Sequence, residues 1–151
     1  MQATRQQAMH RILLVEDDQA DAYLTQRVFK DINRNLHQHI ALEHSETGEA
    51  ALTLLEAHQK DNAPLPDLIL LDLNMPRMDG FTFLEHIKAD PRLRLIPVVV
   101  LTTSSAQSDI RQSYAQGAAG YVVKSTSMDE FTHHMQRLAI YWFELVQRAA
   151  P

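Results

Sequence analysis

The sequence contains no cysteine, which excludes disulfide bridges, zinc–thiolate sites and thiol nucleophiles. Basic residues are also few, because 14 Lys and Arg stand against 19 Asp and Glu, for a formal net charge of -5. This balance argues against nucleic-acid binding through a basic face. No apolar run approaches the roughly 20 residues of a membrane span, and residues 1–10 lack the apolar core of a signal peptide. We therefore expect a cytoplasmic protein that binds neither nucleic acid nor membrane.

The composition of the 151-residue chain fits one folded domain. Hydrophobic residues make up 45% of it and charged residues 22%, which is enough apolar material for a single core. We expect a flexible N-terminal segment over residues 1–10 and one domain over residues 11–148. The helix expected near the C-terminus uses nearly all the residues after Lys124, so no output domain is predicted.

Short apolar runs alternate with segments of helical spacing along the chain. The apolar runs, several of them rich in β-branched residues, are Ile12–Val15, Ile40–Leu42, Leu68–Leu71, Pro97–Leu101 and Tyr121–Val123. The helices are predicted around residues 24–32, after Thr47-Gly48, up to Pro91, over 107–116 and over 127–148, with a long two-proline loop at 57–67. This alternation predicts an α/β fold: a doubly wound, five-stranded parallel sheet covered by five helices, the last of them long.

Polar side chains directly follow four of these apolar runs. They are Glu16 and Asp17, Asp72, Thr102 and Lys124. Doubly wound sheets bind ligands at the carboxyl ends of their strands, so these groups are expected to converge at one edge. Taken singly, the acids are more simply helix caps and Lys124 is a solvated surface lysine. Taken together, they favour a common site.

The chemistry of this set favours phosphoryl transfer. Three carboxylates placed together repel one another unless a cation lies between them, and Mg²⁺ suits a site with few oxygen ligands and several waters. A carboxylate nucleophile at Asp72, the ammonium of Lys124 and the hydroxyl of Thr102 supply an acceptor and charge neutralisation for a phosphoryl group.

Five motifs resemble the receiver domain of two-component response regulators. They are ILLVEDD at 12–18, TGEAAL at 47–52, DLILLDLNMPRMDG at 67–80, IPVVVLTT at 96–103 and GAAGYVVKS at 117–125. The resemblance runs from Arg11 to about Met135 and implies a flavodoxin-like sheet of strand order 2-1-3-4-5. It also implies a signalling protein, not an enzyme, that accepts a phosphoryl group from a histidine kinase.

The resemblance assigns a role to each residue of the expected metal site. Asp72 corresponds to the phosphorylated aspartate of the family. Glu16 and Asp17 correspond to the acid pair that holds Mg²⁺ beside it, and Asn74 to the position whose backbone carbonyl completes the metal site.

The resemblance also implies a conformational switch. Thr102 and Tyr121 correspond to the switch residues, and Lys124 to the lysine that contacts the phosphoryl group. We expect Thr102 to bond a phosphoryl oxygen and Tyr121 to rotate inward. Ser125 stands where the family usually has proline, and a cis bond before a non-proline residue costs about 2.5–4 kcal/mol. The Lys124–Ser125 bond is therefore predicted to be trans.

Three features are similar to the small response regulators paired with bacterial and cyanobacterial phytochromes. These are the long prolyl loop, Ser125 after the lysine and the aromatic C-terminal helix. They imply a bacteriophytochrome histidine kinase as phosphoryl donor. The histidines of this chain have no metal-like spacing, and we expect surface or packing positions for His37, His39, His133 and His134.

The expected C-terminal helix carries more large apolar residues than one buried face needs. One stripe at steps of three and four is sufficient to cover the sheet, so the excess predicts a second buried surface. We therefore expect a homodimer through this helix and the neighbouring strand. The predicted interface consists of Tyr121, Ile140, Tyr141, Phe143 and Val146.

Three alternative functions account for parts of the pattern. A phosphorelay shuttle, which passes the phosphoryl group to a phosphotransfer histidine, is not distinguished from a terminal regulator. A Mg²⁺-dependent phosphatase of the haloacid-dehalogenase class also uses an aspartyl phosphate, but it needs a second aspartate where Asn74 stands. A flavodoxin-type flavin carrier binds a phosphate in the first strand-to-helix loop, where the acids at 16–18 would repel it.

Overall fold

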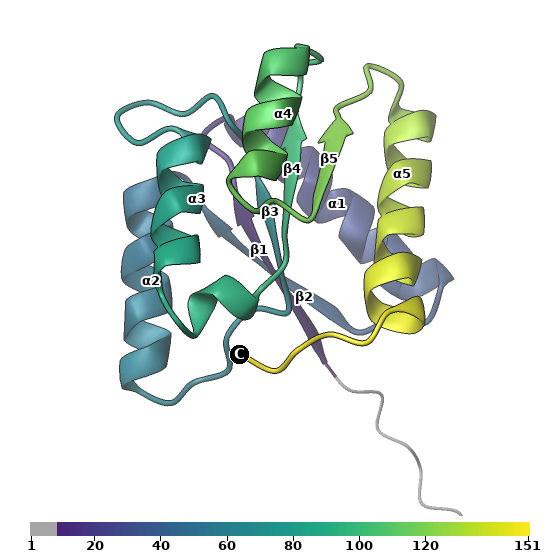
Figure 1. The fold of residues 1–151 in the computed structure, drawn as a ribbon. Coiled ribbons are helices and arrows are strands. Elements are labelled where there is room, and N and C mark those ends of the chain that lie inside the picture. Colours follow the sequence, from purple (N-terminus) through teal and green to yellow (C-terminus); the bar gives the residue numbers. More distant parts are fainter. Residues whose placement is uncertain (1–8) are drawn as a thin grey trace, which may run out of the picture.

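The computed structural model describes residues 9–151, so the expected N-terminal segment lies almost wholly outside the described residues. One sheet contains five parallel strands: β1 (His10–Val15), β2 (Ile40–Ser45), β3 (Leu68–Leu71), β4 (Val98–Thr102) and β5 (Gly120–Val123). Their order is β2-β1-β3-β4-β5 (Figure 1), which confirms the predicted topology. β1 and β2 are longer than the apolar runs that predicted them, because polar residues also pair in the sheet: His10 and Arg11 of β1, and Glu43, His44 and Ser45 of β2.

Alternate residues of the central strands face opposite sides of the sheet. Leu13 and Ile69 belong to one hydrophobic cluster, and Leu14 and Leu70 belong to another. The first cluster includes side chains of α2 (Gly48–Lys60) and α3 (Gly80–Ala89), and the second those of α1 (Gln19–Asn35) and α5 (Met128–Ile140). α4 (Gln107–Ala115) packs beside β5 (Figure 1). Every residue of β3 is buried, because this strand is covered on both faces.

Most helices begin at a side-chain cap. The capping side chain accepts a hydrogen bond from the backbone N–H three residues later at Asp18, Thr47, Asp79 and Ser127. Each cap satisfies one of the free N–H groups of a first helical turn. Gly117 follows α4 with a φ of 97°, a left-handed conformation that glycine adopts without strain. In the described part of the chain, no helix is both long and apolar enough to span a membrane.

Besides the strand ends of β1 and β2, two further predicted boundaries are wrong by several residues. The C-terminal helix was expected over 127–148, but α5 ends at Ile140, and a π-helical turn over Tyr141–Leu145 continues it before the backbone becomes extended. The polar loop was expected over 57–67, but α2 continues to Lys60. Both errors arise because polar and aromatic residues near an element's end do not reveal where its backbone hydrogen bonds stop.

The residues after α5 pack against the amino end of the sheet. Phe143 stacks on the ring of His10, with centroids 4.4 Å apart. Arg148 lies over the Phe143 ring at 5.3 Å and pairs with Asp67 at 2.8 Å. Contacts between segments so distant in sequence explain why the helix ends before residue 148.

Candidate functional site

Three expected acids meet at the carboxyl end of the two central strands. Asp72 directly follows β3, and its N–H donates to the carbonyl of Val15 on β1 at 3.0 Å. Glu16 and Asp17 follow β1 itself. Carboxylate oxygens of Glu16, Asp17 and Asp72 lie within 4.8 Å of one another. Strand pairing therefore brings acids from distant parts of the sequence into one cluster, as expected.

Two members of this acid cluster are almost completely buried: Glu16 is 2% exposed and Asp72 8%. Burial raises the pKa of Glu16 to about 8, and its hydrogen bond with Asp72 adds to the effect, while Lys124 acts in the opposite direction. Neighbouring buried carboxylates are stabilised by a shared proton or by a cation. The oxygen donors of the cluster are of the type that hard divalent cations prefer.

Lys124 reaches the acid cluster from the end of β5. Its backbone N–H donates to the carbonyl of Thr102 at 2.7 Å, which places it beside β4. Its ammonium contacts the carboxylates of Glu16 and Asp21, the latter at 3.0 Å. Burial lowers the pKa of Lys124, but the two ion pairs outweigh burial, so the pKa is raised overall. Within the described structure, no hydrogen bond joins Lys124 to Asp72.

Ser104, in the loop after β4, joins the two expected switch residues. The hydroxyl of the fully buried Thr102 accepts from the Ser104 N–H at 3.5 Å, and the Tyr121 hydroxyl donates to the Ser104 carbonyl at 2.8 Å. Burial raises the pKa of Tyr121. The Ser104 hydroxyl also donates to Asp109 of α4 at 2.6 Å. Sequence reasoning missed Ser104, whose one signal was its position two residues after Thr102.

Sequence reasoning also missed Asp21 and His44. Asp21 lies in the first turn of α1, three residues after the N-cap Asp18, so its closeness in sequence to the acid pair was the available signal. The His44 Nε2 lies 2.7 Å from the backbone oxygen of Glu16, so a histidine of β2 contacts the site from the side. The four histidines expected at surface or packing positions are exposed or half-buried: His37, His39, His133 and His134.

The loop after β3 passes close to the backbone at the end of that strand. Asn74 is exposed, two residues beyond Asp72. The N–H of Gly80 donates to the carbonyl of Leu73 at 2.9 Å. A Cβ on Gly80 would lie 2.6 Å from the Asp72 carbonyl oxygen. Because Gly80 has no side chain, its backbone can lie close to the backbone of Asp72 and Leu73 beside the site.

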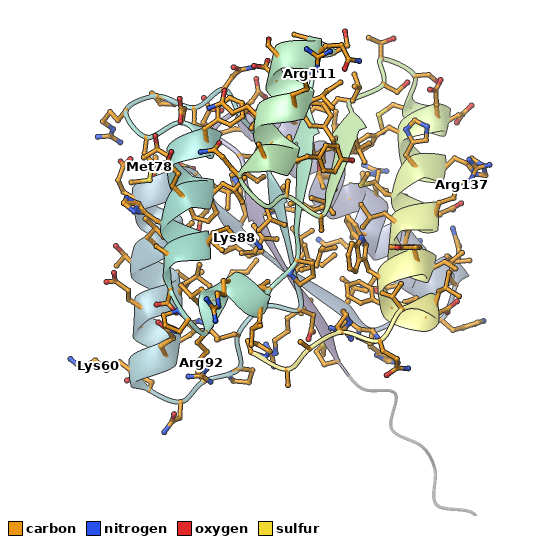
Figure 2. The ribbon with its side chains drawn as sticks, in the orientation of Figure 1. Lys60, Met78, Lys88, Arg92, Arg111 and Arg137 are labelled. Carbon is orange, nitrogen blue, oxygen red and sulfur yellow. The ribbon has the colours of Figure 1, made fainter. Side chains whose placement is uncertain are left out.

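Two loops near the site, the one after β5 and the one after β3, have informative backbone conformations. Residues 9–151 contain no cis peptide bond, so the Lys124–Ser125 bond is trans, as predicted. In the loop after β3, Arg77 adopts a φ of 64°, in the left-handed region that few non-glycine residues occupy. Met78 of the same loop lies at the top of the helix pair α2 and α3 in Figure 2, against Gly48.

The residues expected at a dimer interface differ in exposure. Ile140 is 42% exposed and Tyr141 48%. Tyr121, Phe143 and Val146 are half-buried. The Phe143 ring packs within its own chain, against the core cluster of α1 and α5. The exposed part of this set therefore lies at the end of α5 and in the turn that follows.

Residues 12–136 match the response regulator receiver domain family. The chain belongs to this family. The response regulator Rcp1 of Synechocystis sp. is 41% identical over 136 residues, which cover 89% of this chain and 90% of Rcp1. The probable methanogenesis regulatory protein FilR2 of Methanothrix harundinacea is 38% identical over 131 residues, which cover 87% of this chain and 82% of FilR2.

Solved structures agree with this assignment. The Mn²⁺-bound form of Rcp1 superposes with a TM-score of 0.81 at 39% identity, covering 93% of this chain and 99% of that one. The phosphorylated cyanobacterial phytochrome response regulator RcpA superposes with a TM-score of 0.83 at 35% identity, covering 95% of this chain and 100% of RcpA. The receiver fold and family expected from the five motifs are confirmed.

Membership of the family gives the site its general chemistry. A receiver domain acts in two-component signalling with a histidine kinase, and it binds a divalent metal ion in an acidic pocket. The clustered oxygens of Glu16, Asp17 and Asp72 fit such an ion by donor type and by spacing.

Proposed function

We propose that this response regulator accepts a phosphoryl group on Asp72 from a histidine kinase. An oxygen of Asp72 forms a bond to phosphorus while the phosphorus–nitrogen bond of the donor phosphohistidine breaks, and the electron pair of that bond stays on the histidine nitrogen. The observation that supports this best is the meeting of Glu16, Asp17 and Asp72 with the ammonium of Lys124 at one edge of the sheet.

We assign the metal to Mg²⁺, because two carboxylates beside a nucleophile and one backbone carbonyl leave room for its preferred waters. Glu16, Asp17, Asp72 and the Asn74 carbonyl would hold it. When bound, Mg²⁺ neutralises negative charge on the oxygens of the phosphoryl group. Lys124 adds a fixed positive charge on the same group.

We assign Thr102 and Tyr121 to the conformational change that follows phosphorylation of Asp72. Phosphorylation adds nearly one further negative charge and several strong acceptor oxygens at Asp72. Thr102 turns its hydroxyl from the Ser104 N–H to a phosphoryl oxygen, and Tyr121 moves into the space that this motion leaves. Both side chains bond Ser104 in the loop that leads into α4. The signal thus reaches the surface of α4, β5 and α5, where a partner protein can read it.

The kinase is assigned to the phytochrome class. This assignment is supported by similarity to RcpA, which is a phytochrome response regulator, and by the features noted in the prolyl loop, at Ser125 and in the C-terminal helix. We expect a purified, autophosphorylated phytochrome kinase to label this chain within minutes, and an unrelated kinase to do so much more slowly. Equal rates from both kinases would contradict the phytochrome assignment and leave Asp72 as acceptor.

Mg²⁺ binding is expected to strengthen as pH rises. The raised pKa of Glu16, about 8, means that binding below this pH displaces a proton, so the affinity should fall by up to about tenfold per pH unit below it and level off above it. Calorimetric titrations at pH 6 to 9 measure this slope, and removal of Mg²⁺ by a chelator should stop phosphorylation. A Glu16→Gln variant should bind more weakly with little pH dependence. An affinity equal at pH 6 and pH 8 in the wild type would contradict the shift.

We further propose that the chain forms a homodimer through the end of α5, β5 and the turn after α5. Ile140, Tyr141 and Leu145 are 42%, 48% and 70% exposed, which is unusual for large apolar residues so close together. Light scattering of the phosphorylated and unphosphorylated chain tests this assembly, and a monomer in both states at high concentration would exclude it.

A signalling output is better supported than catalysis on a small substrate. Asn74 occupies the position where a phosphatase with an aspartyl-phosphate intermediate needs a carboxylate, and an amide does not act as a general acid or base there. Onward transfer from Asp72 to a phosphotransfer histidine is the second candidate output. Rapid loss of label to a purified phosphotransfer domain would favour such a shuttle.

A further inference from the structure

The ammonium of Lys124 is held by carboxylates from two different elements. Glu16 belongs to the acid cluster, whereas Asp21 lies in the first turn of α1, three residues after its N-cap Asp18. An oxygen of Asp21 lies 3.0 Å from the Lys124 nitrogen. Among the described residues, Lys124 is the sole hydrogen-bond donor to the Asp21 side chain. The Asp21 carboxylate therefore interacts mainly with this lysine.

Breaking the ion pair between Asp21 and Lys124 would not leave the Asp21 carboxylate buried without a partner. The Asp21 side chain is 41% exposed. Asp21 and Lys124 both line a cavity of about 340 Å³ together with Leu24, Met128 and Phe131. Water in this cavity can solvate a carboxylate that has lost its ammonium partner. Glu16 differs, because its buried side chain has no such access to solvent.

Phosphorylation of Asp72 changes the balance of charge around Lys124. The acceptor gains nearly one negative charge, and Lys124 must bond oxygens that it does not contact in the unphosphorylated chain. Asp21 opposes this in two ways, because it holds the ammonium toward α1 and because its own charge repels the phosphoryl group. A contact that is stronger in one state than in the other shifts the equilibrium between them by the difference.

We propose that Asp21 is a positioning residue that restrains Lys124 in the unphosphorylated chain and so lowers the phosphorylated fraction. This role presupposes phosphorylation at Asp72. Asp21 thereby tunes how much donor is needed for activation, while Glu16, Asp17 and Asp72 provide the chemistry.

An Asp21→Asn variant tests this role, because it removes the charge and keeps the shape. Exposed ion pairs contribute little individually, so we expect the affinity for beryllofluoride, a phosphoryl analogue, to rise by about two- to fivefold at saturating Mg²⁺. The phosphorylated fraction at a limiting phosphoryl donor should rise by the same factor. The ¹⁹F resonance of the bound fluoride nearest Lys124 should shift, a signature that a merely structural role for Asp21 would not alter.

Asp18→Asn is the matched control. It removes the same charge from the same helix start and keeps the cap, because asparagine and aspartate cap helices equally well. Among the described residues, the Lys124 ammonium donates to Glu16 and Asp21 and not to Asp18. Its affinity for beryllofluoride should stay within about 1.5-fold of wild type, as for a screened surface charge. An equal rise in both variants, or no rise or a fall in Asp21→Asn, overturns the inference. A wild-type chain that neither binds beryllofluoride nor accepts phosphate overturns the proposed function instead.

Discussion

An Asp72→Asn variant is expected to take up no phosphoryl group under conditions that label the wild-type chain fully. The substitution replaces a carboxylate nucleophile with an amide of nearly the same shape, and an amide does not attack phosphorus at a useful rate. Glu16 and Asp17 keep their places in the acid cluster but are assigned to the metal, so neither is expected to act as a substitute acceptor. Intact-protein mass spectrometry after incubation with a phosphoryl donor and Mg²⁺ measures the loss.

Unfolding does not account for this expected loss. Asp72 is 8% exposed and lies among two other acids, so removing its charge relieves repulsion, and the thermal midpoint is not expected to fall. An Asp61→Asn variant, changed at the exposed C-cap residue just after α2, should be labelled like the wild type. Labelling of Asp72→Asn at the wild-type level would show that another side chain accepts the phosphoryl group.

A Gly80→Ala variant is expected to lose about 3 kcal/mol of unfolding free energy, at the upper end of the range for overpacked sites. The new Cβ would lie 2.6 Å from the Asp72 carbonyl oxygen and 2.7 Å from the Leu73 Cα. Both are backbone atoms, so no side-chain rotation relieves the clash, and any relaxation displaces Asp72 itself. For a chain of this size the loss corresponds to a fall in Tm of roughly 6 to 12 °C, measured by circular dichroism, with slower phosphorylation.

Gly120→Ala provides the comparison. A Cβ on Gly120 would lie 3.5 Å from a methyl group of Val99, an ordinary van der Waals distance. Alanine in place of this glycine at the start of β5 is therefore expected to be neutral or stabilising by about 0.5–1 kcal/mol. If both variants melted at the wild-type temperature, the closeness of Gly80 to the backbone of Asp72 and Leu73 would not matter for stability.

Local patterns in the sequence were sufficient to predict the fold. The unbroken apolar run of β3 predicted a strand buried on both faces, and Asp72 was predicted at its carboxyl end. The side-chain cap at Thr47 marks a helix start that was predicted from the sequence. These features depend on neighbours within a few residues, which is why a single sequence reveals them.

Contacts between distant residues were not predictable in the same way. The end of the C-terminal helix was placed at 148, because nothing local shows that Phe143 stacks on His10 or that Arg148 pairs with Asp67. The partnership of Asp21 with Lys124 likewise joins residues 103 positions apart. Each of these contacts forms only when two segments far apart in the sequence pack against each other, and no local pattern shows that they do.

The sequence by itself therefore determined the parallel sheet, its family and the groups at its carboxyl edge, because strand periodicity and parallel pairing place residues that follow a strand on that edge. The tertiary structure alone decided how those groups share charge: which carboxylates hold Lys124, how strongly burial raises the pKa of Glu16, and why Gly80 must lack a side chain. The physical reason is that desolvation and steric exclusion depend on every atom packed around a group, and not on its neighbours along the chain.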